Sequence, residues 1–293
     1  MDTPLPLDDE QTRLWNGHAG HAWVRSQALL DCMFQPFEDL LVDAVGAAAA
    51  TRVLDVGCGT GSTTLAIARR LAMRGRCTGI DISAPMITAA RDRADRARAS
   101  ARFLLANAQE HRFEPGGYDM VVSRFGVMFF DDPVRAFGNL RRASRDGAVL
   151  RFIAWRTAAE NPFMTAAERA AAPLLPDLPA RQPDAPGQFA FADPHRVHHI
   201  LSDSGWDEID LQPIDVPCSF PASGLDEYLT QLGPVGVALQ RTTEPLHAQV
   251  VQAVRAAFDP YLHGTDVRFT AACWTVGAKA SPAWTPAQAP GNV

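Results

Sequence analysis

The chain has 293 residues, of which 47% are hydrophobic and 20% are charged, and its formal net charge is −6 at pH 7. This composition is typical of a globular protein with a large core, and the acidic balance lends no general support to a nucleic-acid partner. Lys279 is the only lysine, which excludes chemistry that needs a Tyr-x-x-x-Lys pair or a Gly-Lys-Ser/Thr phosphate loop.

The N-terminal sequence and the cysteines predict a cytoplasmic protein. The first residues are acidic and lack an apolar signal region, and no apolar run approaches the ~18 residues that a membrane span needs. The five cysteines lie far apart without a C-x-x-C pair, so we expect reduced thiols and no metal site. They are Cys32, Cys58, Cys77, Cys218 and Cys273.

The chain begins with a segment of helical spacing. From about Asp8 to Val45, apolar residues recur at steps of three and four, which predicts one or two leading helices. We expect residues 1–50 to form a helical lid.

Short apolar runs then alternate with helix-length segments, and strands that are apolar throughout indicate a parallel sheet with helices on both faces. Residues 51–155 are therefore expected to form a doubly wound, Rossmann-like α/β core. The predicted strands are 52–56, 77–81, 102–106, 117–123 and 147–155, and the predicted helices are 61–73, 84–99 and 133–144.

The second half of the chain is expected to complete this core. Residues 156–192, rich in alanine and proline, predict an inserted helical cap over the sheet edge. Residues 193–280 predict the rest of the sheet: a strand at 207–217, an insertion of two helices at 223–262, and a last, antiparallel strand. The expected fold is thus α/β with seven strands, followed by a disordered tail at 281–293.

A glycine-rich turn follows the first predicted strand. The stretch VLDVGCGTGSTT contains Gly57, Gly59 and Gly61, and alternate glycines let the chain turn tightly into a helix and let a ligand approach the backbone. A dinucleotide fingerprint has its third glycine where this chain has Ser62. Asp55, just before the turn, repels a diphosphate and suits an ammonium group.

The stretch DVGCGTG resembles the first motif, D/E-x-G-x-G-x-G, of the class I S-adenosylmethionine-dependent methyltransferases. The resemblance implies that Asp55 and the whole turn, Cys58 included, hold the methionyl part of S-adenosylmethionine. It also implies that Asp81, 20 positions after Gly61, binds the ribose hydroxyls.

Two further stretches match this family in the expected order. DISAPMITAAR implies that Ile82 and Met86 flank the adenine. LLANAQ implies adenine contacts from Asn107, Ala108 and Gln109, with Asn107 in place of the commoner aspartate. An amide oxygen can still accept from the adenine amino group.

The remaining matches concern the methyl group. SRFG, after the fourth strand, implies that Ser123, Arg124 and Phe125 border the sulfonium. The opening LWNGHAGHAW resembles small-molecule methyltransferases of the type 11, or ubiquinone and menaquinone biosynthesis, group, which implies that Trp15 faces the cofactor. Arg25 is a candidate ligand of its carboxylate. Core packing for Trp15 and a solvated position for Arg25 remain the alternatives.

Together these patterns predict transfer of a methyl group to an O, N or C nucleophile of a small, partly hydrophobic acceptor, leaving S-adenosylhomocysteine. The reaction is an in-line displacement, so the protein chiefly positions the reactants and excludes water. His18, His21 and Arg124 are the catalytic candidates. The alternatives are an NAD(P)-dependent oxidoreductase and a cofactor-binding protein without turnover. The expected partner is a small molecule, with no nucleic acid and no membrane span, and a homodimer is left open.

Overall fold

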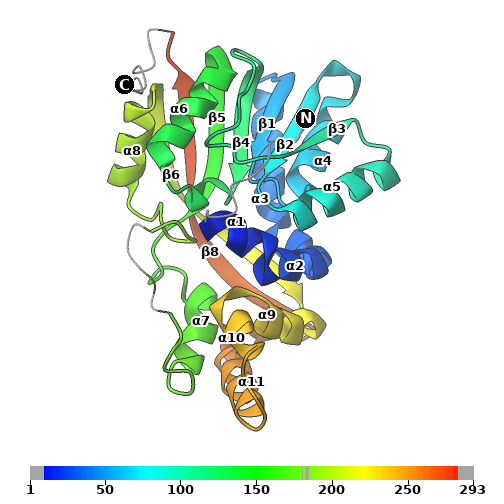
Figure 1. Ribbon diagram of the computed structural model, residues 1–293, viewed down its shortest axis with the longest axis vertical. Helices are drawn as coiled ribbons and strands as arrows, with labels where there is room; N and C mark the ends of the chain where they lie inside the picture. The colour runs from blue at the N-terminus through cyan, green and yellow to red at the C-terminus, as the bar shows by residue number, and fades with distance from the viewer. Residues whose placement is uncertain (1–9, 180, 182–184, 283–293) are drawn as a thin grey trace, which may run out of the picture.

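The computed structural model describes residues 10–179, 181 and 185–282. Most of the predicted tail, 283–293, lies outside the described residues. One mixed sheet runs through the molecule, and a helical lobe lies beyond one end of it (Figure 1).

The sheet has eight strands in the order β3-β2-β1-β4-β5-β8-β6, with β7 paired to β8. Strands β1 to β5 are parallel, and β8 runs antiparallel between β5 and β6. The predicted seven-stranded α/β sheet with an antiparallel last strand is confirmed, and the two-residue β7 is an addition. The strands are β1 Arg52–Val56, β2 Arg76–Asp81, β3 Ala101–Leu105, β4 Tyr118–Arg124, β5 Ser144–Trp155, β6 Trp206–Pro221, β7 Leu262–His263 and β8 Asp266–Ala280.

Three helices precede the sheet, where one or two were predicted. The helical spacing is interrupted at Gly17 and at Ser26, which divide the segment. The helices are α1 Glu10–Asn16, α2 His18–Arg25 and α3 Gln27–Ala47. α3 packs against the sheet and buries Phe37 and Leu41, whereas α1 and α2 lie below the lower ends of the strands (Figure 1).

The helices between the strands begin at local signals in the sequence. Ser83, Asp132 and Asp193 each accept a hydrogen bond from a backbone N–H of the following turn, and a proline stands at the first or second helical position. Such a cap satisfies an N–H that has no partner within the helix. The helices are α4 Ser62–Leu71, α5 Ala84–Ala97, α6 Pro133–Ala143 and α8 Pro194–Asp203.

The two predicted insertions meet in one helical lobe. From the first comes α7 Pro162–Ala171, and from the second come α9 Leu225–Gln231, α10 Gly233–Leu239 and α11 Leu246–Ala257. The second insertion thus has three helices instead of two, because Gly233, at φ +69°, ends the first one. α7 packs against α10 and α11, so both insertions share a core at the bottom of Figure 1.

Strands β6 and β8 carry this lobe. β5 pairs with β8 only as far as Trp155 with Cys273, but β6 and β8 continue together until Pro221 faces Asp266. Beyond β5 they form a two-stranded ribbon that leads into the lobe (Figure 1). The lobe is fixed to the ribbon by aromatic packing, since the Phe163 ring of α7 stacks on Phe269 of β8 at 3.8 Å between centroids.

Candidate active site

The glycine turn is closely packed at Gly57 and at Gly61. Gly57, Gly59 and Gly61 have φ values of +66°, +53° and +85°, a region that favours glycine. A Cβ on Gly57 would lie 2.5 Å from the Cα of Gly126, and one on Gly61 would lie 2.9 Å from the ring of Phe103. The turn thus leaves bare backbone beside the N-terminus of α4, where N–H groups attract partial negative charge.

The carboxylate of Asp81 holds this turn from the neighbouring strand. Its Oδ2 accepts from the Gly59 N–H at 2.8 Å and its Oδ1 accepts from the Ser83 N–H at 2.9 Å. Burial raises the pKa of Asp81, and these backbone hydrogen bonds offset part of the rise. Asp81 also lines the main cavity, so it is placed to meet a ligand that lies on the turn.

Asp55 lies behind the turn and does not line the cavity. It is 1% exposed, and its Oδ2 accepts from the Thr64 hydroxyl at 2.6 Å. Burial raises the pKa of Asp55 to about 7, although the Thr64 hydrogen bond and the charge of Arg124 lower it. The structure therefore separates Asp55 from direct ligand contact, because a strand residue two positions before the turn points into the packed layer beneath α4.

The residues predicted around adenine gather on one wall of the cavity. Ile82, Met86, Asn107, Ala108 and Gln109 all line it. The Asn107 Oδ1 accepts from the Gln109 N–H at 2.9 Å, so the amide is fixed by its own turn. A carbonyl oxygen has a second lone pair, and the side chain can still accept from a ligand.

At the end of β4, the three predicted residues have different placements. Ser123 is fully buried, and its hydroxyl donates to the Val56 carbonyl at 2.7 Å. Phe125 has a φ of +66°, which is strained for a side chain of this size, and its ring stacks on Trp155 at 4.6 Å. Arg124 and Phe125 line the cavity, whereas Ser123 does not.

Arg124 brings a cation to this part of the cavity. Its guanidinium lies 5.5 Å from the ring centroid of Phe34 and bonds the Phe34 carbonyl at 3.5 Å, a long contact. Burial lowers its pKa, while the carboxylates of Asp31, Glu38 and Asp55 raise it. With these nearby acids, the end of β4 can hold both a carboxylate and an ammonium group.

Helices α1 and α2 close the cavity and are bonded to the loop after β2. Asn16 donates to the Ile82 carbonyl at 2.9 Å and accepts from the Ala84 N–H at 2.8 Å. The Ser83 hydroxyl donates to the Trp15 carbonyl at 2.6 Å. A Cβ on Gly20 would clash with that carbonyl and with Ser83, so these helices sit directly against the residues that follow Asp81.

Three predicted residues of α2 and two of the glycine turn lie outside the cavity. His18, His21, Arg25, Cys58 and Gly61 are absent from its lining. Arg25 donates to Gln231 of α9 at 2.9 Å, and His21 bonds the Gly17 carbonyl. All eight histidines belong to the described part of the chain, and none lines the cavity.

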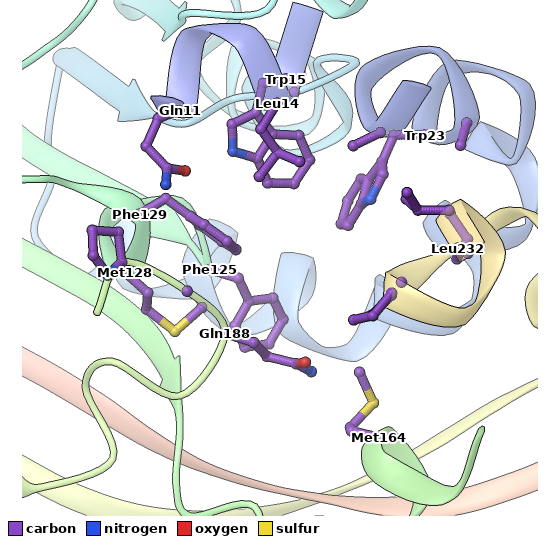
Figure 2. A pocket seen from close by; sticks show the side chains of 18 of the residues that line it. Gln11, Leu14, Trp15, Trp23, Phe125, Met128, Phe129, Met164, Gln188 and Leu232 are labelled. Carbon is purple, nitrogen blue, oxygen red and sulfur yellow. The ribbon is translucent and has the colours of Figure 1, made fainter. Parts of the chain in front are cut away.

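The cavity has a volume of about 1010 Å³ and two unlike ends. One end is the glycine turn with the wall around Asp81, and the other is the lobe. Figure 2 shows the side chains between them, with Trp15 and Trp23 above, Phe125, Met128, Phe129 and Gln188 at one side, and Met164 and Leu232 opposite.

Several lining residues had no predicted role. The apolar run GVMFF at 126–130 pointed to a hydrophobic acceptor, and it supplies Met128 and Phe129. Met164, Gln188 and Tyr228 reach the cavity only because α7, α9 and the segment before α8 meet in space. No local pattern marks them, because each stands in an ordinary amphipathic or loop sequence.

Within the described residues, no group of three or more His, Cys, Asp or Glu side chains converges as a metal site would require. None of the helices described there has the length and apolar character needed to cross a membrane.

Known proteins resemble the core of this chain. Residues 53–147 match a family described as a methyltransferase domain. The demethylmenaquinone methyltransferase of Lactiplantibacillus plantarum is 34% identical over 100 residues, which cover 33% of this chain and 42% of that protein. Aklanonic acid methyltransferase DauC of Streptomyces sp. strain C5 is 33% identical over 104 residues, covering 35% and 47%. The chain spans about half the length of these curated relatives.

A solved structure extends the likeness beyond the core. The description of that structure reads "Conversion of a Disulfide Bond into a Thioacetal Group during Echinomycin Biosynthesis". It has a TM-score of 0.54 at 20% identity, over 84% of this chain and 82% of that one. This likeness shows the fold alone. The match over residues 53–147, which contain the glycine turn and Asp81, supports a class I S-adenosylmethionine-dependent methyltransferase. The predicted fold is confirmed, and the predicted resemblance to this family, whose cofactor is S-adenosylmethionine, is supported by the matches to its core.

Proposed function

We propose that the protein binds S-adenosylmethionine on the glycine turn and transfers its methyl group to a small, partly hydrophobic acceptor. The observation that carries this proposal is the shared cavity. Bare backbone at Gly57 and Gly59, with Asp81 beside it, opens into the same space as an apolar chamber under α1 and α2. A cofactor and an acceptor can therefore meet in one enclosed volume.

The residues on the turn fit an adenosine with an amino-acid tail. Asp81 would accept from the ribose hydroxyls, and Ile82 and Met86 would flank the adenine. Arg124 takes the tail carboxylate in this proposal, because it lines the cavity at the end of β4 whereas Arg25 does not. Glu38 lies near that guanidinium and supplies the negative field that an ammonium group needs.

The protein's part in the reaction is positioning. The bound cofactor supplies an electrophilic methyl group and a neutral leaving group. Trp15, Trp23 and Phe129 exclude water from the space beside it, and holding two reactants in line can contribute ~7–11 kcal/mol to lowering a barrier. Since no imidazole lines the cavity in the described residues, we infer an acceptor atom that needs no histidine base.

The names of the relatives support an acceptor of the quinone or aromatic-acid kind. One relative is named for demethylmenaquinone and the other for aklanonic acid. The apolar and aromatic lining around Met128 and Trp23 suits a ring system of this type. We also propose a cytoplasmic location, supported by five cysteines that form no disulfide. The mass of the particle in solution tests whether the protein forms a homodimer.

Calorimetry tests the cofactor first. We expect S-adenosylmethionine and S-adenosylhomocysteine to bind, NADH not to bind, and Asp81→Ala to weaken binding at least tenfold. Asp92→Ala, an exposed position on α5, is the matched control and should bind normally. Binding of NADH alone would reverse the proposal.

A methyl-transfer screen over quinones, phenols and aromatic acids then tests the reaction. We expect turnover with at least one of them. Tight cofactor binding without transfer to any acceptor would favour a cofactor-binding protein without turnover.

A further inference from the structure

The lobe end of the cavity contains polar side chains among apolar ones. Glu168 of α7, Arg181 and Tyr228 of α9 all line the cavity there. We call these three residues the distal polar cluster. Helices α7 and α9, which carry Glu168 and Tyr228, belong to the lobe and lie away from β1 and β2 (Figure 1).

Glu168 and Arg181 form a two-pronged ion pair. The Arg181 Nε lies 2.9 Å from one oxygen of Glu168, and Nη2 lies 2.5 Å from the other. The guanidinium also lies 4.8 Å from the ring centroid of Phe189. The Glu168 side chain is only 17% exposed. The pair therefore fixes a carboxylate at the cavity wall and carries no net charge, and each oxygen keeps a lone pair for another donor.

The Tyr228 hydroxyl faces the same space with a weak partner. Its contact is the sulfur of Met164 at 3.9 Å, and no nitrogen or oxygen within the described chain bonds to it. Its ring is fixed by the rings of Phe163, Phe220 and Phe258. Burial, and to a smaller extent the charge of Glu168, raise the pKa of Tyr228, so the hydroxyl keeps its proton. A secluded hydroxyl gains free energy when a ligand supplies the missing partner.

Between the distal polar cluster and the cofactor wall, the lining is mostly apolar and aromatic, with Gln11 and Gln188 as polar exceptions. Trp15 meets Trp23 and Phe129 edge to face at 5.9 and 5.1 Å between centroids. Met164 and Leu232 point inward from the opposite side (Figure 2). The whole volume of about 1010 Å³ lies at the upper end of the ~300–1,000 Å³ found for single drug-sized ligands, so an acceptor of several rings fits beside a cofactor.

We propose that Glu168 and Tyr228 form a recognition site for a hydroxyl group at the end of a polycyclic, largely apolar acceptor, opposite the atom that is methylated. This inference rests on the proposed methyltransferase function and names its acceptor class. A hydroxyl donates to the Glu168 carboxylate and accepts from Tyr228. Because the Glu168–Arg181 pair carries no net charge, this end offers no net attraction to a charged group, which favours a neutral hydroxyl.

Binding of a defined probe tests the proposal. The protein is first saturated with S-adenosylhomocysteine, whose binding is measured separately. It is then titrated, by quenching of tryptophan fluorescence, with emodin, a trihydroxyanthraquinone, and with its trimethyl ether, which has the same rings and no donor. We expect emodin to bind about tenfold more tightly than the ether, because a hydrogen bond to a charged group is lost in the ether.

Two variants locate the effect. Tyr228→Phe removes one hydroxyl from an aromatic cluster that tolerates the ring, and Glu168→Gln removes the charge at constant shape. Each variant should bind emodin roughly fivefold more weakly than the wild type and keep the same affinity for the ether and for S-adenosylhomocysteine. Tyr261→Phe is the control, since Tyr261 packs on Phe163 in the same lobe without lining the cavity.

The outcomes separate the two proposals. If S-adenosylhomocysteine does not bind, the proposed function fails. If S-adenosylhomocysteine binds but the wild-type protein binds neither emodin nor its ether, the recognition site is refuted while the function stands. The same holds if the wild-type protein binds both probes equally tightly. Unaltered emodin affinity in both variants refutes the recognition site as well.

Discussion

The glycine turn and the lobe both line the same cavity, yet they are built from different kinds of chain segments. The turn, Asp81 and the residues after β4 all stand at the carboxyl ends of neighbouring parallel strands, where doubly wound sheets bind their ligands. The lobe collects α7 and α9 to α11 from two distant segments on a ribbon of β6 and β8. We infer that the cofactor end is set by sheet topology and the acceptor end by packing.

The largest expected effect is a loss of stability that should differ between the two ends of the cavity. Phe163→Ala should lower the free energy of unfolding by about 3–5 kcal/mol, as for other buried aromatics, because Phe163 is 1% exposed and stacks on Phe269. Loss of hydrogen-exchange protection should be confined to the lobe, with cofactor affinity within threefold of wild type. Equal loss across the β1 to β5 strands would show that the two ends are one cooperative unit.

The reverse experiment damages the turn. Gly57→Ala combines a left-handed φ with a clash against Gly126, so we expect about 2–4 kcal/mol of destabilisation in urea unfolding and no detectable cofactor binding. Gly264→Ala is matched, since its φ is +64° but no atom lies within 4 Å of the added Cβ. The difference between the two variants measures the clash alone, and equal losses would argue against it.

The pH dependence of stability tests the turn end of the cavity, because Asp55, whose pKa is raised, lies there. Below the ordinary pKa of 3.8, folded and unfolded chains both hold the proton, and between there and about 7 only the folded chain holds it. Asp55 therefore makes stability fall as pH rises through this window, with the full cost above it. Asp55→Asn keeps the Thr64 hydrogen bond and removes the titration.

As the pH rises from 5 to 8, the free energy of unfolding of the Asp55→Asn variant should increase by about 2 kcal/mol relative to that of the wild type, as measured by urea unfolding. A constant difference between the two proteins across this range would contradict the raised pKa. Asp92→Asn, exposed on α5, controls for a general change in charge.

The smallest expected effect concerns the contact between α1 and the cofactor wall. Asn16→Ala removes the bonds to Ile82 and Ala84, and we expect three- to tenfold weaker cofactor binding, through faster release, by stopped-flow fluorescence. Gln27→Ala removes a side-chain bond to Asp31 within α3 and should leave release unchanged. Normal release from the Asn16 variant would mean that α1 does not retain the cofactor.

Sequence patterns predicted the sheet and the cofactor wall because both are local. Buried strands are continuous apolar runs, and Gly57, Asp81 and Asn107 stand where those runs end, so position along the chain gives position in space. Asp55 shows the limit, because spacing does not tell which side of the turn a carboxylate occupies. The structure places it beneath α4, bonded to Thr64.

The acceptor end could not be predicted in the same way. Tyr228, Glu168 and Arg181 are brought together by contacts between α7, α9 and a loop, and helical periodicity in each segment is satisfied by many packings. The candidate bases of α2 illustrate this, since helical spacing made His18 and His21 plausible without fixing which helix face meets the cavity. Arg25 likewise bonds Gln231 across the lobe boundary.

Pro221 and Asp266 face each other across β6 and β8, so the 44-residue span between them leaves and re-enters the sheet at a single point, as the loop of a β-hairpin does. The three helices in that span form a cassette that can be lengthened, shortened or exchanged without altering the order of any strand. Under the proposed function, a change of acceptor can therefore be made at this hairpin tip while the strand ends around Gly57 and Asp81 stay as they are.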